Sequence, residues 1–241
     1  MTDKKIALIT GANKGIGKEI ARQLGKLGIM VIIGARDEKK GKEAEKELRS
    51  QGIDVLTVKL DVTEQSTIDA AALEIEKKFG KLDILVNNAG IGIDTGKPST
   101  IDIDTLYRTY NTNVFGPFRM IKTFLPLLQK SEAGRIVNMS SGLGSLERNS
   151  SKYWETSGTK LLAYNSSKSA LNALTLQFAY ELRKTAIKVN SAAPGFVATD
   201  INQYRGTRTV EQGARAPVRL ATLPEDGPTG GFFEEDGPVP W

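Results

Sequence analysis

The chain has 241 residues, 39% hydrophobic and 25% charged, and it contains neither cysteine nor histidine. This length and composition are typical of one soluble globular domain. The absence of both residues excludes disulfides, thiolate nucleophiles, zinc–cysteine sites, iron–sulfur clusters and imidazole bases. The net charge of +5 comes from interspersed charges rather than a basic block, so nucleic acid is not expected as a partner.

No apolar run approaches the ~18 residues of a membrane span, so no membrane partner is expected. The first residues, Met-Thr-Asp-Lys-Lys, lack the apolar core of a signal peptide. A cytoplasmic location is therefore expected.

Short apolar runs typical of buried strands alternate with runs that have helical spacing. Strands are predicted at 6–9, 31–33, 55–58, 84–86, 136–139 and 187–189, and helices at about 16–27, 37–50, 64–79, 103–128 and 171–182. Pro117 and Pro126 should bend or divide the fourth helix. This alternation predicts a single α/β domain over residues 1–241, with a Rossmann-type, doubly wound parallel sheet in a three-layer α/β/α arrangement.

The alternation ends after about Pro194. Thr209 and Gln212 form a capping-box pattern that starts a further helix, and Phe232-Phe233 is expected as a late edge strand. About residues 195–225 should cover the substrate, with 201–205 and the helix from Thr209 as candidates.

The charged residues of this last part do not specify a ligand. Arg205, Arg208 and Arg215 could attract an anionic carbonyl compound or be solvated, and the solvated reading is favoured. Glu234-Glu235-Asp236 is interpreted as a solvated turn, because adjacent carboxylates lack the spacing of metal ligands. No metal is expected.

A glycine-rich segment, Thr10-Gly11-Ala12-Asn13-Lys14-Gly15-Ile16-Gly17, joins the first predicted strand to the first helix. At such a turn, backbone N–H groups and a helix N-terminus can approach a pyrophosphate. The GxxxGxG spacing differs from the usual GxGxxG fingerprint, so this motif alone also fits a plain glycine turn.

Five further segments follow this loop in a fixed order. They are Asn87-Asn88-Ala89-Gly90, Asn113 within Asn-Thr-Asn-Val-Phe-Gly, Ser140-Ser141, Tyr164-Asn165-Ser166-Ser167-Lys168, and Pro194-Gly195-Phe196-Val197-Ala198-Thr199. Together the six elements resemble the short-chain dehydrogenase/reductase family over about residues 5–200. Ala12-Asn13-Lys14-Gly15 and Gly230-Gly231-Phe232-Phe233 are most similar to its carbonyl-reductase branch.

The resemblance implies four catalytic residues. Tyr164 would protonate the carbonyl oxygen, and Ser141, rather than Ser140, would donate a hydrogen bond to it. Lys168 would hold the nicotinamide ribose, and Asn113 would bind a water behind Lys168. Tyr164 and Lys168 are four positions apart and share a helix face, where an ammonium would lower the phenol's pKa from about 10.

The choice of cofactor depends on Gly34-Ala35-Arg36-Asp37, at the end of the second strand. A carboxylate there binds the 2′-hydroxyl of NAD, whereas an arginine accommodates the 2′-phosphate of NADP. Arg36 and Lys14 favour NADP, while Asp37 fits either a helix N-cap or a ribose ligand. The implied cofactor-binding residues are Gly11, Asn13, Lys14, Gly15, Ile16, Gly17, Arg36, Asp61, Val62, Asn88, Ala89, Gly90, Tyr164, Lys168, Pro194, Gly195, Val197 and Thr199.

The resemblance thus implies an NADPH-dependent oxidoreductase that reduces a small-molecule aldehyde or ketone, reversibly an alcohol dehydrogenase, by metal-independent hydride transfer. One alternative is a catalytically silent NADP-binding sensor or scaffold. Another is a sugar epimerase or dehydratase, which the chain length and glycine spacing disfavour.

The chain departs from the family pattern in one segment. Ser141 and Tyr164 lie 23 positions apart, further than is usual in the family. The extra segment, about 146–160 with Tyr153 and Trp154, resembles an insertion of carbonyl reductases. It lies beside the surface that other members use to form tetramers, so it puts that assembly in doubt. A monomer or a dimer fits the insertion, and the homo-oligomeric state is left open.

Overall fold

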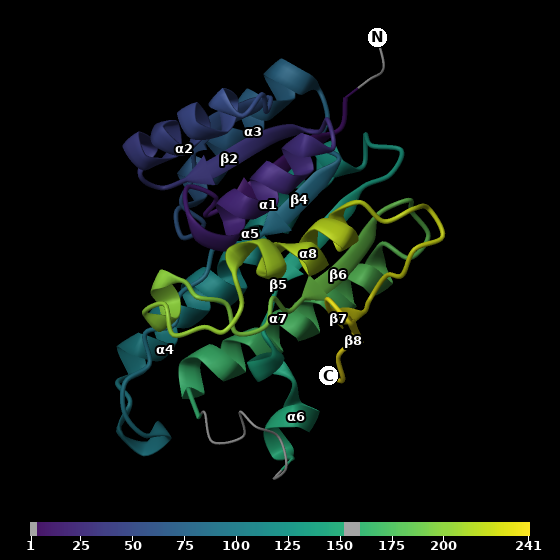
Figure 1. Ribbon diagram of the computed structural model, residues 1–241. Coiled ribbons are helices and arrows are strands. Elements are labelled where there is room, and N and C mark those ends of the chain that lie inside the picture. Colours follow the sequence, from purple (N-terminus) through teal and green to yellow (C-terminus); the bar gives the residue numbers. More distant parts are fainter. Residues whose placement is uncertain (1–3, 152–159) are drawn as a thin grey trace.

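The computed structural model describes residues 4–151 and 160–241. In this part of the chain eight strands form one sheet, in the order β3-β2-β1-β4-β5-β6-β7-β8 (Figure 1). The strands are β1 Ile6–Thr10, β2 Met30–Ala35, β3 Val55–Lys59, β4 Ile84–Asn87, β5 Arg135–Met139, β6 Lys188–Ala192, β7 Phe232–Glu234 and β8 Gly237–Pro238. All neighbours pair in parallel except β8, which runs antiparallel to β7.

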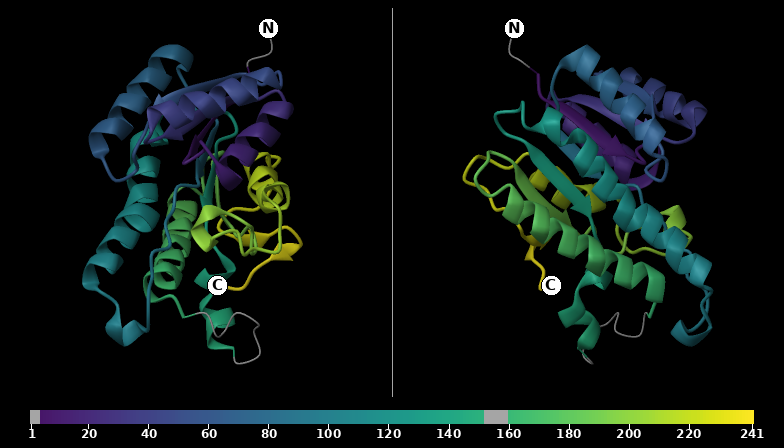
Figure 2. Two further views of the ribbon diagram at one scale, coloured as in Figure 1. Left: turned by 60° about the vertical axis from the view of Figure 1, so that its left-hand side comes forward. Right: turned by 180° about the vertical axis from the view of Figure 1, so that it is seen from behind.

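Helices cover both faces of the sheet (Figures 1 and 2). On one face lie α1 Gly15–Lys26, α2 Glu38–Ser50 and α8 Val210–Ala221; on the other lie α3 Gln65–Phe79, α5 Gly116–Leu128 and α7 Leu162–Glu181. Shorter elements are α4 Ile103–Tyr110, α6 Leu146–Ser150 and the 3-10 turns Pro98–Thr100, Gly142–Gly144 and Asp200–Asn202. The predicted three-layer, doubly wound α/β fold is confirmed.

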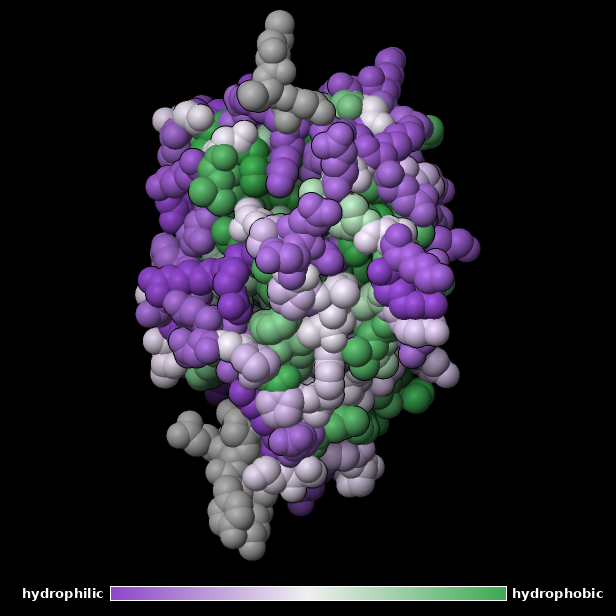
Figure 3. Space-filling model, turned by 90° about the vertical axis from the view of Figure 1, so that its right-hand side faces the viewer, coloured by the Kyte–Doolittle hydropathy of each residue, from purple (hydrophilic) through white to green (hydrophobic). Residues whose placement is uncertain are grey.

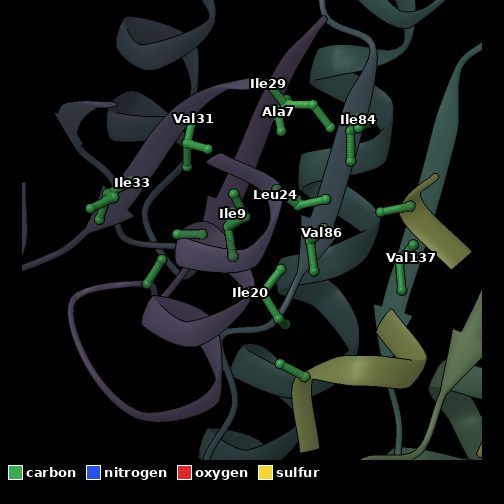
Figure 4. Packing of buried hydrophobic residues seen from close by; sticks show 14 of the residues in the cluster. Ala7, Ile9, Ile20, Leu24, Ile29, Val31, Ile33, Ile84, Val86 and Val137 are labelled. Carbon is green, nitrogen blue, oxygen red and sulfur yellow. The ribbon is translucent and has the colours of Figure 1, made fainter. Parts of the chain in front are cut away.

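The core explains why the central strands are continuously apolar. Every residue of β1 is buried, and its side chains alternate between the two layers of helices. Ile9 points toward Ile20 and Leu24 of α1 (Figure 4), whereas Leu8 packs on the opposite side, in the cluster that contains Phe124 of α5. Fully burying one such side chain contributes about 1.5–3 kcal/mol, so the two layers fix the strand ends that carry the loops.

The predicted fourth helix is divided, but not where its prolines led us to expect. A π-helical turn at Asn111–Phe115 separates α4 from α5 and precedes both prolines. Pro117 lies in the first turn of α5, directly after the π-helical turn, in which the Gly116 N–H bonds to the Asn111 carbonyl; Pro126 lies inside the helix near its end.

The strand expected at Phe232-Phe233 is present as β7, but it is not the edge of the sheet. The two-residue β8 pairs with its outer side.

The side of the molecule on the right of Figure 1 carries small hydrophobic patches separated by hydrophilic residues (Figure 3). Among the described residues no helix is both long and apolar enough to cross a membrane.

Candidate active site

The glycine-rich segment 10–17 forms the turn between β1 and α1. Gly11 and Gly15 have φ values of +62° and +55°, which L side chains rarely adopt. Lys14 is the N-cap of α1, and its side chain accepts no hydrogen bond from the first N–H groups of this helix. Exposed N–H groups at a helix N-terminus favour an anion such as a phosphate.

This turn is fastened to the end of β4. The Asn88 amide donates to the carbonyls of Thr10, at 2.9 Å, and Gly11, at 3.2 Å, while Thr10 Oγ1 accepts the N–H of Ala89 at 2.9 Å. A Cβ on Gly17 would lie 2.4 Å from Asn88 Nδ2, so only glycine allows this approach. The hydrogen bonds therefore hold two of the motifs together.

A cavity of about 800 Å³ runs along the carboxyl ends of β1 to β4. Most of the predicted cofactor-binding residues line it: Gly11, Asn13, Lys14, Gly15, Ile16, Gly17, Arg36, Asp61, Val62, Asn88, Ala89, Gly90 and Thr199. At its wall, Asp61 accepts hydrogen bonds from the N–H and hydroxyl of Thr63 at 2.9 and 2.7 Å.

The other predicted cofactor-binding residues are not among the lining residues. Tyr164 and Lys168 lie next to one end of the cavity: a Cβ on Gly92 would be 3.2 Å from Tyr164 Cδ2, and one on Gly90 would be 3.5 Å from Lys168 Nζ. Pro194, Gly195 and Val197 precede the lining residues Ala198 and Thr199, and Val197 is buried.

The opposite end of the cavity carries charges of both signs, because the carboxylates of Asp37, Glu43, Glu47 and Asp200 lie beside the cations there. Arg36 and Lys14 also line an adjoining cavity of about 620 Å³, together with Lys40. Lys14 forms an ion pair with Asp200, whereas the Arg36 side chain has no hydrogen-bond or ion-pair partner in the described part of the chain. Arg36 is therefore available to an anionic ligand.

Asp37 is explained by the local fold. Its carboxylate accepts the N–H of Lys40 at 3.1 Å and caps α2. That hydrogen bond is the main cause of the lowered pKa of Asp37. Of the two readings left open by the sequence, the structure shows the helix N-cap.

Tyr164 and Lys168 lie on one face of α7. Lys168 Nζ is 5.5 Å from the centre of the Tyr164 ring and donates to the Met139 carbonyl at 2.7 Å. Lys168 is only 4% exposed. Burial lowers the pKa of Lys168 to about 8 and raises the pKa of Tyr164, which a hydrogen bond with Ser141 partly offsets. The expected lowering of the phenol pKa is thus not found in this structure, because desolvation outweighs the effect of Ser141.

The two serines after β5 differ in their contacts. The Ser141 side chain lies close enough to the Tyr164 hydroxyl to lower the pKa of the phenol, and it accepts the N–H of Leu143 at 3.2 Å. Ser140 is 3% exposed, and its hydroxyl points at the Lys168 carbonyl at 3.5 Å. The fold therefore brings Ser141, rather than Ser140, to the phenol.

Asn113 lies in the π-helical turn, fully buried. Its amide donates to the Ile91 carbonyl at 2.8 Å and to Ser167 Oγ at 3.0 Å, while its Oδ1 accepts the Ile91 N–H at 2.9 Å. Asn113 thus holds the loop after β4 against α7, instead of bonding its own helix backbone.

The segment after Thr199 contributes only partly to the cavity. Ile201 and Tyr204, both among the predicted candidates, line it. The first turn of α8 also lines it, with Val210 and Glu211, while Ala214 and Leu220 further along this helix are buried in the core beside α1. Sequence reasoning missed Ile91–Ile93, which also line the cavity; their position directly after Asn87–Gly90 was the available signal.

The arginines of this segment are engaged by the protein. Arg208 and Arg215 both pair with Glu235, and Arg205 donates to the Asn202 carbonyl at 3.1 Å. The expectation of a solvated acidic turn is therefore wrong for Glu235, because Arg208 and Arg215 form ion pairs with it. It is also wrong for Glu234, whose carboxylate lies 2.6 Å from the guanidinium of Arg148 in α6.

No group of three or more potential metal ligands occurs within residues 4–151 and 160–241.

The predicted insertion at 146–160 begins with α6, whereas Tyr153 and Trp154 lie outside the described residues.

Comparison with known proteins gives consistent matches. The family model described as "short chain dehydrogenase" matches residues 5–209. Short-chain dehydrogenase/reductase 1 of Saponaria officinalis is 36% identical, covering 100% of this chain and 97% of that protein. Carbonyl reductase (NADPH) 3 of Rattus norvegicus is 34% identical, covering 92% of each. The crystal structure of NADPH-bound carbonyl reductase from chicken fatty liver superposes with a TM-score of 0.86, at 26% identity and full coverage of both chains.

Proposed function

The chain belongs to the short-chain dehydrogenase/reductase family of oxidoreductases, and on this basis we propose that it reduces an aldehyde or ketone with NADPH. The observation that carries the proposal is the cluster of Tyr164, Ser141 and Lys168 next to one end of the cavity. The similarity of the chain to rat carbonyl reductase (NADPH) 3 and to the NADPH-bound carbonyl reductase from chicken supports the same activity.

The cavity suits a dinucleotide with a 2′-phosphate. The uncapped N-terminus of α1 suits the pyrophosphate, and the unpartnered Arg36 suits the additional phosphate. Lys168 would hold the nicotinamide ribose. The remaining cofactor contacts are proposed at the positions that resemble the family, from Gly11 to Thr199. When bound, NADPH supplies the hydride, and the protein supplies position and protons.

The proposed roles follow from the contacts of each side chain. Tyr164 stays protonated because burial raises its pKa, so it can donate the phenol proton to the carbonyl oxygen as the acid in reduction. Ser141 orients that oxygen through a hydrogen bond. Asn113 holds Ile91 and thereby one wall of the cavity. In the reverse direction the tyrosinate would take the proton from an alcohol.

The test follows NADPH oxidation, by the loss of nicotinamide absorbance, against a panel of aldehydes, ketones and quinones. Tyr164→Phe is expected to lower turnover by about 10²–10⁴-fold with NADPH binding retained. Tyr180→Phe is the matched control, since Tyr180 lies on the same helix but is 66% exposed. NADPH binding without carbonyl-dependent oxidation, together with no effect of Tyr164→Phe, would favour the silent sensor or scaffold instead.

A further inference from the structure

The first turn of α7 is held by a side chain that is distant in sequence. The N-cap residue, Leu161, provides no side-chain hydrogen bond, and the first turn contains no acidic residue. In its place the two carboxylate oxygens of Asp94 accept the N–H groups of Ala163, at 2.7 Å, and Tyr164, at 3.0 Å. A carboxylate at this end of a helix also has a favourable interaction with the helix dipole.

Asp94 belongs to the loop that forms the wall of the cavity. It directly follows Ile91–Ile93, and Asn113 fixes this loop at Ile91 by two hydrogen bonds. At Gly92 the loop passes so close to the Tyr164 ring that a Cβ would be 3.2 Å from Cδ2. The loop therefore contacts Tyr164 both at its ring and, through Asp94, at its backbone.

We infer that Asp94 is a positioning residue that fixes the first turn of α7 and so sets the place of the Tyr164 hydroxyl relative to Ser141 and Lys168. The inference rests on the proposed function for its effect on turnover. Lys168 lies one turn further along α7 and is held separately by the Met139 carbonyl. Loss of Asp94 should therefore displace the tyrosine more than the lysine.

The experiment compares Asp94→Ala and Asp94→Asn with the matched control Asp102→Ala. Asp102 lies in the same connection, caps α4 by accepting the Asp104 N–H at 3.0 Å, and is exposed and outside the cavity lining. Both alanine variants remove a helix cap, and thermal unfolding measures the structural cost of each.

Asp94→Ala should lower kcat about tenfold or more, since small misplacements of a reacting group cost this much, while the Kd for NADPH stays within about twofold. Asp94→Asn, which keeps one acceptor oxygen but turns an NH2 group toward the other N–H, should recover only part of the turnover. Asp102→Ala should leave kcat unchanged. An unchanged kcat in Asp94→Ala would overturn the positioning role.

A second readout does not require turnover. With 13C-labelled tyrosine, the Tyr164 signal is assigned by its disappearance in Tyr164→Phe and followed as the pH is raised. Asp94→Ala should shift this titration toward that of an ordinary tyrosine, because a frayed first turn admits water, and Asp102→Ala should not. If the wild type reduces no carbonyl but this shift occurs, the proposed function fails and the role of Asp94 stands. If the wild type is active and the titration does not move, Asp94 is only a cap.

Discussion

The two ends of the cavity, which we call the nucleotide end (Lys14 and Arg36) and the catalytic end (Tyr164 and Lys168) after their proposed roles, hold charged side chains in different environments. At the nucleotide end, the Lys14 side chain is 66% exposed, and the neighbouring Arg36 is open to solvent. At the catalytic end, Lys168 is 4% exposed, and its pKa is lowered to about 8. Exposed charges attract ligands in a way that salt screens, whereas buried groups are tuned by desolvation and by fixed hydrogen bonds.

This contrast indicates a division of work along the cavity. At the nucleotide end, backbone N–H groups and cations are expected to bind an anion. Single substitutions there should therefore alter the affinity for NADPH. The catalytic end consists of side chains that contact one another, so single changes there should alter turnover or stability. The predictions below test this division, from the largest expected effect to the smallest.

The strongest test compares the two serines. Ser141→Ala should lower kcat about 10²–10³-fold, because it removes a hydrogen-bond donor at the oxygen where charge develops. Ser140→Ala should leave kcat within a few-fold, since its 3.5 Å contact is with a backbone carbonyl rather than with Tyr164. Steady-state kinetics with saturating NADPH decides between them. Equal losses in both variants would contradict the assignment of Ser141.

The buried lysine predicts a dependence of stability on pH. Because the pKa of Lys168 falls from 10.5 to about 8 on folding, the unfolded chain binds more protons between these values. The free energy of unfolding should therefore rise with pH across this window, by roughly 3 kcal/mol relative to Lys168→Met, which cannot titrate. Chemical denaturation at a series of pH values measures the difference. Parallel curves for the two proteins would show that Lys168 is not desolvated.

At the nucleotide end, Arg36→Ala should raise the KM for NADPH about 10–100-fold and leave NADH and kcat unchanged, because one charge-assisted hydrogen bond contributes about 1.5–3 kcal/mol. Lys39→Ala is the control, as it removes a charge three positions further on, in the first turn of α2, from a residue that lines neither cavity. Added salt should weaken NADPH binding in the wild type more than in Arg36→Ala. A preference of the wild type for NADH would contradict the role of Arg36.

The sequence predicted the nucleotide end better than the catalytic end, for a physical reason. Glycines at 11, 15 and 17 are required by local backbone geometry, so their spacing carries the information. The place of Arg36 follows directly from the end of a buried strand. Such local constraints are visible without knowing the tertiary contacts.

The catalytic end depends on contacts between distant segments. The i,i+4 spacing of Tyr164 and Lys168 was predictable, but the direction of the Tyr164 pKa was not, because burial depends on the loop after β4 and on the serines. The hydrogen bonds of Asp94 to α7 span 69 and 70 positions, and no local pattern indicates them. The π-helical turn that contains Asn113 was not predicted either, because Pro117 and Pro126 indicated that the helix would bend at other positions.

The smallest predicted effect concerns Asp200, whose carboxylate accepts hydrogen bonds from both Lys14 and the Tyr204 hydroxyl. This pairing competes with a 2′-phosphate for Lys14 and places a negative charge beside it. Asp200→Asn should therefore tighten NADPH binding about two- to fivefold without affecting NADH, in keeping with the ~1 kcal/mol limit of exposed ion pairs.

Fluorescence titration with NADPH and NADH measures the change, and Asp54→Asn, which breaks the exposed pair with Lys4 far from the cavity, is the control. High salt should remove the gain, and so should Lys14→Ala in the same chain, because both eliminate the attraction that Asp200 masks. Weaker NADPH binding in Asp200→Asn would show the opposite balance. In that case the ion pair contributes more by holding residues 199–204 over the cavity than it costs by occupying Lys14, and the nucleotide end would depend on side-chain contacts as the catalytic end does.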